Sequence, residues 1–430
     1  HPAHQTIDLT PQLRVLHLVH QYPPEHLGGT ELYTQTVARA LSARSHPVSV
    51  FTRRNAHGAG RAETLDADVA VHLAWNGALS PTQRFLTTFG NADLERNFDS
   101  VLADFRPDLV HIQHLMGLPT SLLHSIRRRG IPYIVTLHDF WWVCANAQLV
   151  TNYSGEICNG PNLWLNCARC ALARGQQNAL WPAIPALAVM LARRGGGLRR
   201  VLEDAACLIA PSRFVKDWYA EHGIAAGHIR VLSHGIDAPP HTREDNTDHP
   251  RRFLYAGGLA WQKGVHIAVE ALAGVRGDSS LWIAGDETFD PAYSARLRAL
   301  AANAPAGQVR FLGRLSRAQL WQTLAQVDAV VVPSLWYETF SLIVHEAFAA
   351  GVPVVVSNLG ALAEAVRHQI DGLRVEPGDV DAWRKTLQRL VDDPTLATTL
   401  AAQIRPPMTL DDHITQLQQI YRQAVAAHDQ

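Results

Sequence analysis

The sequence lacks an excess of charge of either sign. Its 430 residues include 38 Lys and Arg against 39 Asp and Glu, which gives a formal net charge of -1. Proteins that hold nucleic acid need a basic excess to bind phosphates, so this balance argues against a nucleic-acid partner. Hydrophobic residues make up 47% of the chain. That share excludes an intrinsically disordered protein and predicts a folded one with substantial cores.

Targeting and membrane-spanning segments are also missing from the pattern. The first ten residues, HPAHQTIDLT, contain no apolar core, so we expect no signal peptide. The longest uncharged run, 175–192, includes Gln, Asn and two prolines. Its apolar part is shorter than the roughly 20 residues that a spanning helix needs. We therefore expect a cytoplasmic protein, with peripheral contact at the inner face of the plasma membrane left open.

Short aliphatic runs alternate with segments of helical periodicity along the whole chain. Runs that are apolar on both faces and separated by helices are typical of parallel sheets covered by helices. The expected strands are 14–19, 48–52, 108–112, 133–137 and 207–210 in the first half, and 253–256, 281–284, 309–312, 328–332, 353–357 and 373–375 in the second.

A polar, proline-rich stretch at 238–252 separates these two sets of strands. It predicts an α/β protein with two doubly wound, Rossmann-like domains rather than one barrel. We expect an N-terminal domain at 12–237, with a cysteine-bearing insert at 140–175, and a C-terminal domain at 253–407. A last helix lies within 408–430. Doubly wound domains bind ligands at the carboxyl ends of their strands, so two facing domains predict an interdomain cleft.

Glycine-containing loops follow the first strand of each half. Gly28 and Gly29 precede a predicted helix, where small residues let backbone N–H groups approach an anion. Gly257 and Gly258 are followed by Lys263, whose cation can neutralise a diphosphate. Each glycine pair also fits a tight turn without a ligand, so neither loop identifies a site by itself.

A third loop, at 333–342, carries the strongest signal. It contains Glu338, and Glu346 follows eight residues later on a predicted helix. Glu338 is expected at the mouth of the loop, and at about 3.6 residues per turn a spacing of eight brings the side chain of Glu346 back to nearly the same face. If the helix begins near Ser341, its free N–H groups offer an anion site between the two carboxylates.

Together these motifs resemble the family-four retaining glycosyltransferases of the GT-B fold, of the type that assembles bacterial polysaccharides and glycans. The resemblance covers 14–393, and its motifs occur in the family's order. They are Tyr22-Pro-Pro with Gly28-Gly29, Leu137-His138-Asp139, Gly257 with Lys263-Gly264, and Glu338-x7-Glu346. The resemblance implies a nucleoside diphosphate sugar as donor substrate, held by the second domain, and a final helix that crosses back onto the first domain.

The resemblance also implies roles for individual residues. His138 and Glu338 would lie at the transferred sugar as catalytic residues, and Glu346 would bind the ribose hydroxyls of the nucleotide. The full donor-binding set is Gly28, Gly29, Gly258, Lys263, Phe340, Ser341, Leu342 and Glu346. A lysine and helix-terminal N–H groups can stabilise a departing diphosphate, so we expect that catalysis requires no metal cofactor.

Three positions depart from residues that are frequent in the family. Gly258 stands where Arg is frequent, His234 where Asn is usual, and Thr339 where Pro is frequent. The first departure removes an expected contact to the diphosphate. The core set of His138 and the donor-binding residues stays intact.

Four of the 5 cysteines lie close together in the insert. They are Cys144, Cys158, Cys167 and Cys170, with the spacing C-x13-C-x8-C-x2-C. In a reducing compartment clustered cysteines favour metal over disulfides, and four thiolates suit a structural zinc ion. Disulfides and free thiols stay open as alternatives. Cys207 falls within an expected strand and is predicted to be a core residue.

Residues 180–200 combine apolar side chains with arginines. Trp181 and Met190 stand there with Arg193 and Arg200, a composition that suits a membrane surface and a lipid-linked acceptor. An ordinary surface helix packed on the first domain explains the same pattern. The neutral charge of the whole chain favours that second interpretation.

We therefore predict a metal-independent, retaining glycosyltransferase that moves a sugar from a nucleoside diphosphate to a glycan or lipid-linked glycan. Two alternatives stay open: a catalytically degenerate sugar-nucleotide-binding subunit, and a glucan- or sucrose-type synthase of the same fold. A dinucleotide-dependent dehydrogenase is excluded, because no Gly-x-Gly-x-x-Gly follows the first expected strand.

Overall fold

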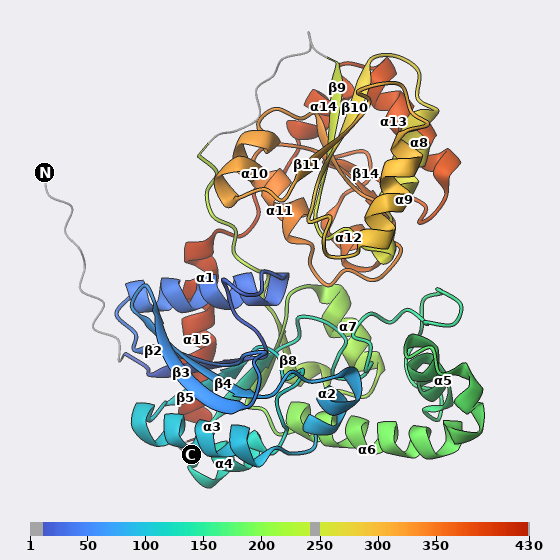
Figure 1. Ribbon diagram of the computed structural model, residues 1–430. Coiled ribbons are helices and arrows are strands. Elements are labelled where there is room, and N and C mark those ends of the chain that lie inside the picture. Colours follow the sequence, from blue (N-terminus) through green and yellow to red (C-terminus); the bar gives the residue numbers. More distant parts are fainter. Residues whose placement is uncertain (1–11, 241–249, 429–430) are drawn as a thin grey trace, which may run out of the picture.

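The computed structural model describes residues 12–240 and 250–428, which form two sheets with helices on both faces (Figure 1). Most of the expected linker, 241–249, lies outside the described residues. The predicted architecture of two Rossmann-like α/β domains is confirmed. Among the helices in the described ranges, none combines the length and the apolar character needed to cross a bilayer.

The first domain contains an eight-stranded sheet with the order β3-β4-β2-β1-β5-β6-β7-β8. Its strands are β1 (Val15–Val19), β2 (Val48–Arg53), β3 (Ala59–Asp66), β4 (Val69–Asn76), β5 (Leu109–Ile112), β6 (Tyr133–Thr136), β7 (Cys207–Ala210) and β8 (Ile229–Val231). Its helices are α1 (Gly29–Ala43), α2 (Pro81–Thr87), α3 (Ala92–Phe105), α4 (Leu122–Arg128), α5 (Leu165–Arg174), η1 (Asn178–Ala183), α6 (Ile184–Glu203), α7 (Arg213–Glu221) and η2 (Ala226–His228).

The second domain contains a six-stranded sheet with the order β11-β10-β9-β12-β13-β14. Its strands are β9 (Arg251–Ala256), β10 (Ser279–Ala284), β11 (Val309–Gly313), β12 (Ala329–Val332), β13 (Val354–Ser357) and β14 (Gly372–Val375). The helices that follow the linker are η3 (Trp261–Lys263), α8 (Val265–Ala273), α9 (Pro291–Ala301), α10 (Arg317–Leu324), α11 (Leu342–Ala349), α12 (Gly360–Ala365), α13 (Val380–Asp392), α14 (Leu396–Ala401) and α15 (Leu410–His428).

Each sheet separates two hydrophobic clusters because successive side chains of a strand point to opposite faces. In β1, Leu16 and Leu18 belong to one cluster, whereas Val15 and Val19 belong to another. This burial on both faces explains why the strands appear in the sequence as continuous apolar runs.

Three strands, β3, β4 and β8, were not predicted from the sequence. β3 pairs antiparallel with β4 at the edge of the first sheet, so the expectation of parallel strands is wrong at this edge. Every residue of β3 is exposed or half-buried. Its sequence, AGRAETLD, therefore carries no apolar run that marks a strand.

The last helix, α15, returns from the second domain and packs on the first one, as predicted (Figure 1). One side of α15 is buried in the cluster that contains Val15 and Val37. The Tyr421 hydroxyl is hydrogen-bonded to His111 Nδ1, at 2.7 Å. The buried side of α15 consists of Ile414, Leu417, Ile420, Tyr421 and Ala424.

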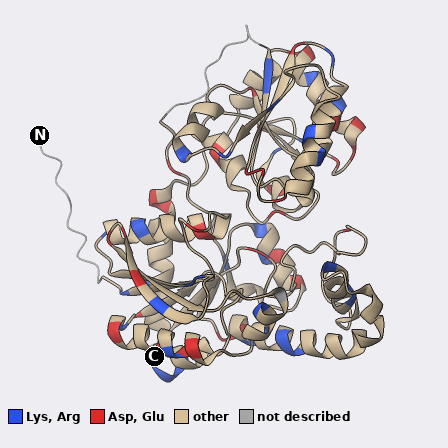
Figure 2. Ribbon diagram, viewed as in Figure 1, with Lys and Arg blue, Asp and Glu red and all other residues tan. Residues whose placement is uncertain are grey.

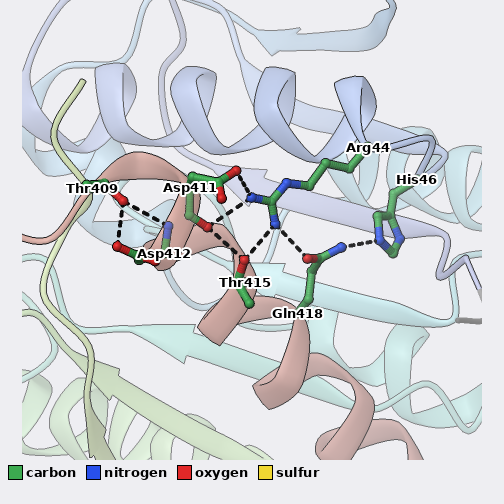
Figure 3. Close-up of polar contacts among 7 residues, drawn as sticks. All are labelled: Arg44, His46, Thr409, Asp411, Asp412, Thr415 and Gln418. Atoms are coloured by element: carbon green, nitrogen blue, oxygen red, sulfur yellow. Dashed lines mark hydrogen bonds and ion pairs between the residues drawn. The ribbon is translucent and has the colours of Figure 1, made fainter. Parts of the chain in front are cut away.

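A polar network holds the start of α15 against the loop after α1 (Figure 3). The Arg44 guanidinium donates to Thr415 Oγ1 at 3.1 Å and to Gln418 Oε1 at 2.8 Å, and it forms an ion pair with Asp411. The amide nitrogen of Gln418 lies 2.7 Å from His46 Nε2. The apolar side of α15 and this network fix the helix on the first domain in one register.

We expect Tyr421→Phe to lower the free energy of unfolding by about 1–3 kcal/mol, because His111 Nδ1 then loses its partner inside the core. Urea denaturation would measure this change. The matched control is Tyr153→Phe, whose hydroxyl bonds to no described residue and whose loss should cost less than about 0.5 kcal/mol. Equal effects of the two substitutions would contradict the assigned role of the Tyr421 hydroxyl.

Candidate functional site

The predicted site residues lie at the carboxyl ends of parallel strands in both domains. His138 follows β6, Lys263 follows β9, and Glu338 follows β12. Parallel strands end at a common edge of their sheet, which is where doubly wound folds bind ligands. The two sheets place these edges so that loops of one domain contact loops of the other.

Glu338 is the most heavily hydrogen-bonded carboxylate of the site. Its Oε1 accepts from Lys263 Nζ at 2.8 Å, from Ser334 Oγ at 2.8 Å and from Trp336 Nε1 at 2.9 Å. The Lys263 ammonium also lies 4.8 Å from the centre of the Trp336 ring. No hydrogen bond from a described residue reaches Oε2, which leaves that oxygen for a ligand.

The ionisation of Glu338 reflects two opposing effects. Burial by itself raises the pKa of this carboxyl group, but the charge and hydrogen bond of Lys263 and the two further donors lower it more. The net result is a pKa below the usual range of a glutamate. Glu338 is therefore ionised at neutral pH although it is buried.

Backbone geometry explains why Lys263 and Glu338 meet, although they stand far apart in the sequence. Leu335 N donates to Gln262 O at 2.8 Å, which joins the loop after β12 to η3. Gly264 follows η3 with φ of +67°, and a Cβ atom there would lie 1.9 Å from the carbonyl oxygen of Pro333. Only glycine permits this close approach of the two loops.

His138 is buried and belongs to a chain of hydrogen bonds. Its Nε2 lies 2.7 Å from Gln113 Oε1, and Gln113 Nε2 lies 3.1 Å from His17 Nδ1. Burial is the main cause that lowers the pKa of His138 to about 3, so the ring is neutral. Because Gln113 presents its amide oxygen, Nε2 of His138 carries the proton and Nδ1 is left as an acceptor.

One hydrogen bond links the loops of the two predicted catalytic residues. Thr339 Oγ1 donates to the carbonyl oxygen of His138 at 2.7 Å, and Ser212 Oγ donates to the carbonyl oxygen of Thr339 at 2.8 Å. Thr339 is one of the departures from the family pattern, and its hydroxyl makes a contact that proline could not make. The structure thus brings His138 and Glu338 onto facing loops.

Glu346 lies on α11, and its carboxylate forms an ion pair with Arg317 of α10. Arg317 Nη2 also lies 3.5 Å from Asp237 Oδ2. Burial raises the pKa of Glu346, and Arg317 offsets part of that rise. The helix begins at Leu342, so Glu338 lies in the preceding loop. This agrees with the expected helix start near Ser341, with Glu338 at the mouth of the loop.

The start of α11 has the form expected of an anion site. Ser341 adopts a left-handed conformation with φ of +65°, and α11 begins at the next residue. Within the described residues, no acceptor takes a hydrogen bond from the N–H groups of Phe340, Ser341 or Leu342. Three unpaired N–H groups at a helix N-terminus favour an anion.

The predicted glycines lie at loop positions with space around them. No atom lies within 4 Å of a Cβ built on Gly29 or on Gly258, whereas a Cβ on Gly28 would meet Glu31 Oε2 at 2.5 Å. Tyr255 donates to the carbonyl oxygen of Gly258 at 2.7 Å. Gly29 and Gly258 therefore leave room for a ligand, and Gly28 makes room for a buried glutamate.

Sequence reasoning missed several polar residues of this region. Glu31 Oε1 lies 3.3 Å from His20 Nε2, and Asp139 Oδ2 lies 3.1 Å from His114 Nε2. The centres of the His20 and His114 rings are 4.4 Å apart, with the ring planes tilted by 44°. Gln113 and Arg317 were missed as well. Asp139 belongs to the Leu137-His138-Asp139 motif, whereas His20, Glu31, Gln113 and Arg317 belong to no motif. The positions of His20 after β1 and of Gln113 after β5 were the available signal.

The described residues give no structural support to the zinc site predicted in the cysteine insert. The described residues contain no group of three or more His, Cys, Asp or Glu arranged to hold a metal ion, and all five cysteines are free. Burial raises the pKa of Cys167 to about 12, with the neighbouring thiols adding to the rise, so it stays protonated. Zinc at Cys144, Cys158, Cys167 and Cys170 therefore stays a sequence prediction without structural support.

Comparison with known families divides the chain into two parts. Residues 27–238 match the family described as Glycosyltransferase Family 4, and residues 241–405 match Glycosyl transferases group 1. An uncharacterized glycosyltransferase of Methanocaldococcus jannaschii is 33% identical, over 89% of this chain and 90% of its own length. Glycogen synthase of Mycobacterium tuberculosis is 29% identical, over 93% of this chain and 91% of its own.

Solved structures show the same architecture. Sucrose-phosphate synthase from Thermosynechococcus elongatus superimposes with a TM-score of 0.72 and 21% identity, covering 97% of this chain and 100% of its own. HepE of Anabaena, in complex with UDP and glucose, gives a TM-score of 0.65 and 18% identity, covering 95% and 99%. At these identities the likeness establishes the fold, which is GT-B.

We expect Lys263→Ala to lower the free energy of unfolding by about 1–3 kcal/mol at pH 7, because the Glu338 carboxylate loses its cation while it stays buried. The folded-state pKa of Glu338 is below its unfolded value, so its contribution is present above the unfolded pKa and disappears as the pH falls. The loss should therefore shrink below about pH 4.

Urea denaturation between neutral and acid pH checks this prediction. Lys385→Ala on α13 is the matched control, because Lys385 is exposed and has no ion-pair partner among the described residues. A loss of stability that is equal for both variants, or that persists unchanged in acid, would refute the assigned role of Lys263.

Proposed function

We propose that this chain, which belongs to the glycosyltransferases that join a Glycosyltransferase Family 4 domain to a group 1 domain, transfers a sugar from a nucleoside diphosphate to a glycan or lipid-linked glycan with retention at the anomeric carbon. The chain is a glycosyltransferase of the GT-B fold. The stereochemistry, the acceptor and the residue roles below are the proposal, as are the domain limits of 12–237 on the acceptor side and 253–407 on the donor side.

The contact set of Glu338 is the observation that carries this proposal. A buried, ionised carboxylate is held beside a lysine and in front of the unpaired N–H groups that begin α11. Thr339 then joins this loop to His138 of the other domain. A donor sugar placed between the two loops would meet a carboxylate oxygen, a cation and a neutral imidazole.

The leaving group sets the electrostatic requirement of the reaction. Cleavage of the anomeric bond leaves positive charge on the sugar and negative charge on the departing diphosphate. In our proposal Lys263 and the N–H groups of Phe340, Ser341 and Leu342 bind that diphosphate, because cations and helix N-termini stabilise developing negative charge. These groups take the place that a metal ion would fill.

The proposal of retention depends on the role of Glu338 as a ligand of the sugar hydroxyls and not as a nucleophile. A double displacement needs a carboxylate poised to attack the anomeric carbon. Three donors already hold Glu338 Oε1. We propose that Oε2 binds hydroxyl groups of the transferred sugar, and that the acceptor attacks from the face that the diphosphate leaves. His138, neutral and fixed by Gln113, binds the same sugar from the first domain.

The acceptor is inferred from its surroundings. Relatives carry names as different as glycogen synthase and D-inositol 3-phosphate glycosyltransferase, so their names select no single acceptor. The insert after His138 reaches the second domain, because the Trp261 ring lies against Gly155. Its composition suits a glycan acceptor carried on a lipid. Free thiols throughout the described chain are consistent with a reducing cytoplasm.

Binding of donors tests the proposal directly. Purified protein is mixed in turn with UDP-, GDP-, ADP- and dTDP-sugars, and one nucleotide series should raise the melting temperature. At a hundredfold excess over Kd, the bound donor adds about 2.7 kcal/mol to the free energy of unfolding. The anomeric configuration of the product, measured by NMR, tests retention. Stabilisation by none of these donors, or an inverted product, would overturn the corresponding part of the proposal.

We expect Glu346→Ala to weaken nucleotide binding about tenfold or more, because a charged hydrogen bond to the ribose contributes about 1.5–3 kcal/mol. Isothermal titration with UDP or ADP measures it. Glu203→Ala is the matched control, since it removes a glutamate that pairs with Arg199 at 2.6 Å on α6 of the first domain, outside the proposed donor domain. Unchanged affinity of the Glu346 variant would remove this residue from the nucleotide site.

A further inference from the structure

The cysteine-bearing insert and the helices that follow it, η1 and α6, expose several large apolar side chains. Leu163 is 81% exposed and Trp181 is 70% exposed. We call the exposed side of α5, η1 and α6 the insert face. Its large apolar members are Leu163, Leu165, Leu180, Trp181, Val189 and Met190. Six large apolar side chains exposed within one segment, 163–190, point to an interaction site in a folded protein.

Helix α6 shows that this exposure is not ordinary amphipathic packing. The inner side of its first turns, including Ile184 and Leu191, packs with α5 in a small hydrophobic cluster. The opposite side should then be polar, yet Ala186, Val189 and Met190 point to solvent there. A helix that is apolar on both sides is expected to be covered on both sides.

The charge of the insert has one sign. No Asp or Glu occurs between Glu156 and Glu203, so α5 and nearly all of α6 carry basic charge alone (Figure 2). Arg193 and Arg200 continue the exposed side of α6 that begins with Val189, at helical spacings of four and seven residues. Neither arginine has an ion-pair partner among the described residues.

Arg194, on the same helix, is a packing residue and does not belong to the insert face. It is buried, its guanidinium lies 4.5 Å from the centre of the Trp141 ring, and it donates to the Trp141 carbonyl oxygen at 3.0 Å. Arg194 therefore anchors α6 to the domain. Arg193 and Arg200 stay outside with their charge uncompensated.

These features select one occupant. A second copy of the chain packed through the same face would set arginines against arginines, which is unfavourable in a symmetric interface. A free glycan would offer hydroxyl groups and little apolar surface. Apolar side chains edged by unpaired arginines match the interface of a bilayer that contains anionic lipids.

We propose that the insert face docks the protein on an anionic lipid bilayer. This inference rests on the proposed function in one respect, because a membrane would present a lipid-linked acceptor to the site. The insert connects the two, since its loop at Gly155 contacts Trp261, two residues before Lys263. Docking through Trp181 and Met190 would then connect the membrane surface to the donor site through the continuous segment 155–190.

Vesicle binding by the full chain tests the proposal. Sedimentation with phosphatidylcholine vesicles containing about a third of phosphatidylglycerol should retain the protein at about 0.1 M salt and release it at high salt. Trp181→Ser combined with Met190→Ser should weaken binding by more than about tenfold. Phe289→Ser is the matched control, because Phe289 is 72% exposed on the second domain and should not matter.

Two arginine variants separate charge from apolar contact. Arg193→Gln with Arg200→Gln should weaken binding to phosphatidylglycerol vesicles by about tenfold or more, since each basic residue near an anionic surface contributes about a fivefold effect. Arg96→Gln, at an exposed position on α3, is the control and should bind as the unmodified chain does. Circular dichroism and nucleotide affinity should be unchanged in all of these variants, which establishes that they are folded.

Several results would overturn the proposal. One is failure of the unmodified chain to bind anionic vesicles, and another is equally strong binding to pure phosphatidylcholine. A third is a loss of binding in the Phe289 control as large as that in the Trp181 variant. A dimer in analytical ultracentrifugation that the Trp181 variant abolishes, without vesicle binding, would assign the face to a second copy. Donor binding is measured without vesicles, so failure of the proposed function and failure of membrane docking are distinguishable.

Discussion

A buried carboxylate must be compensated by a cation and hydrogen-bond donors, and this requirement at Glu338 organises the second domain's side of the site. The donors come from its own loop, through Ser334 and Trp336, and from a separate loop, through Lys263. The two loops can approach because Gly264 leaves space for the carbonyl of Pro333. The same lysine therefore neutralises the carboxylate and ties the loop after β9 to the loop that leads into α11.

The first domain's side of the site depends on neutral groups in place of charges. Burial keeps His138 unprotonated, and Gln113 fixes which ring nitrogen carries its proton. The helix α15 contributes from behind, because His413 lies 3.0 Å from the Tyr33 hydroxyl, and the Tyr33 ring contacts His138. Helix α15 thus supports His138 through Tyr33, which ties the end of the chain to the site.

The sequence allowed the fold to be predicted well where burial is two-sided, as in β1 and β5, because such strands leave continuous apolar runs. It failed at β3, whose exposed residues leave no run. Motif order located Lys263 and Glu338, but spacing could not show that they touch. Gln113 and Arg317 belong to no motif, so three-dimensional packing alone identifies them. Cysteine spacing suggested a metal, whereas a metal site depends on side-chain geometry that spacing does not determine.

The contacts between the domains explain how one arrangement is held without a shared core. Glu364 of α12 accepts from the backbone N–H groups of Arg213 at 2.9 Å and Phe214 at 2.6 Å, so a carboxylate of one domain caps α7 of the other. Negative charge at a helix N-terminus is favourable, and Thr339 adds the neutral bond to His138. Most of the buried apolar residues cluster within one domain, but Tyr337 packs against the first domain's cluster and Ile236 belongs to one of the second domain's clusters. Separating the domains would therefore break polar bonds, aromatic contacts such as Phe214–Tyr337, and these few apolar contacts. Interdomain contacts that are mainly polar allow two domains of one chain to move relative to each other.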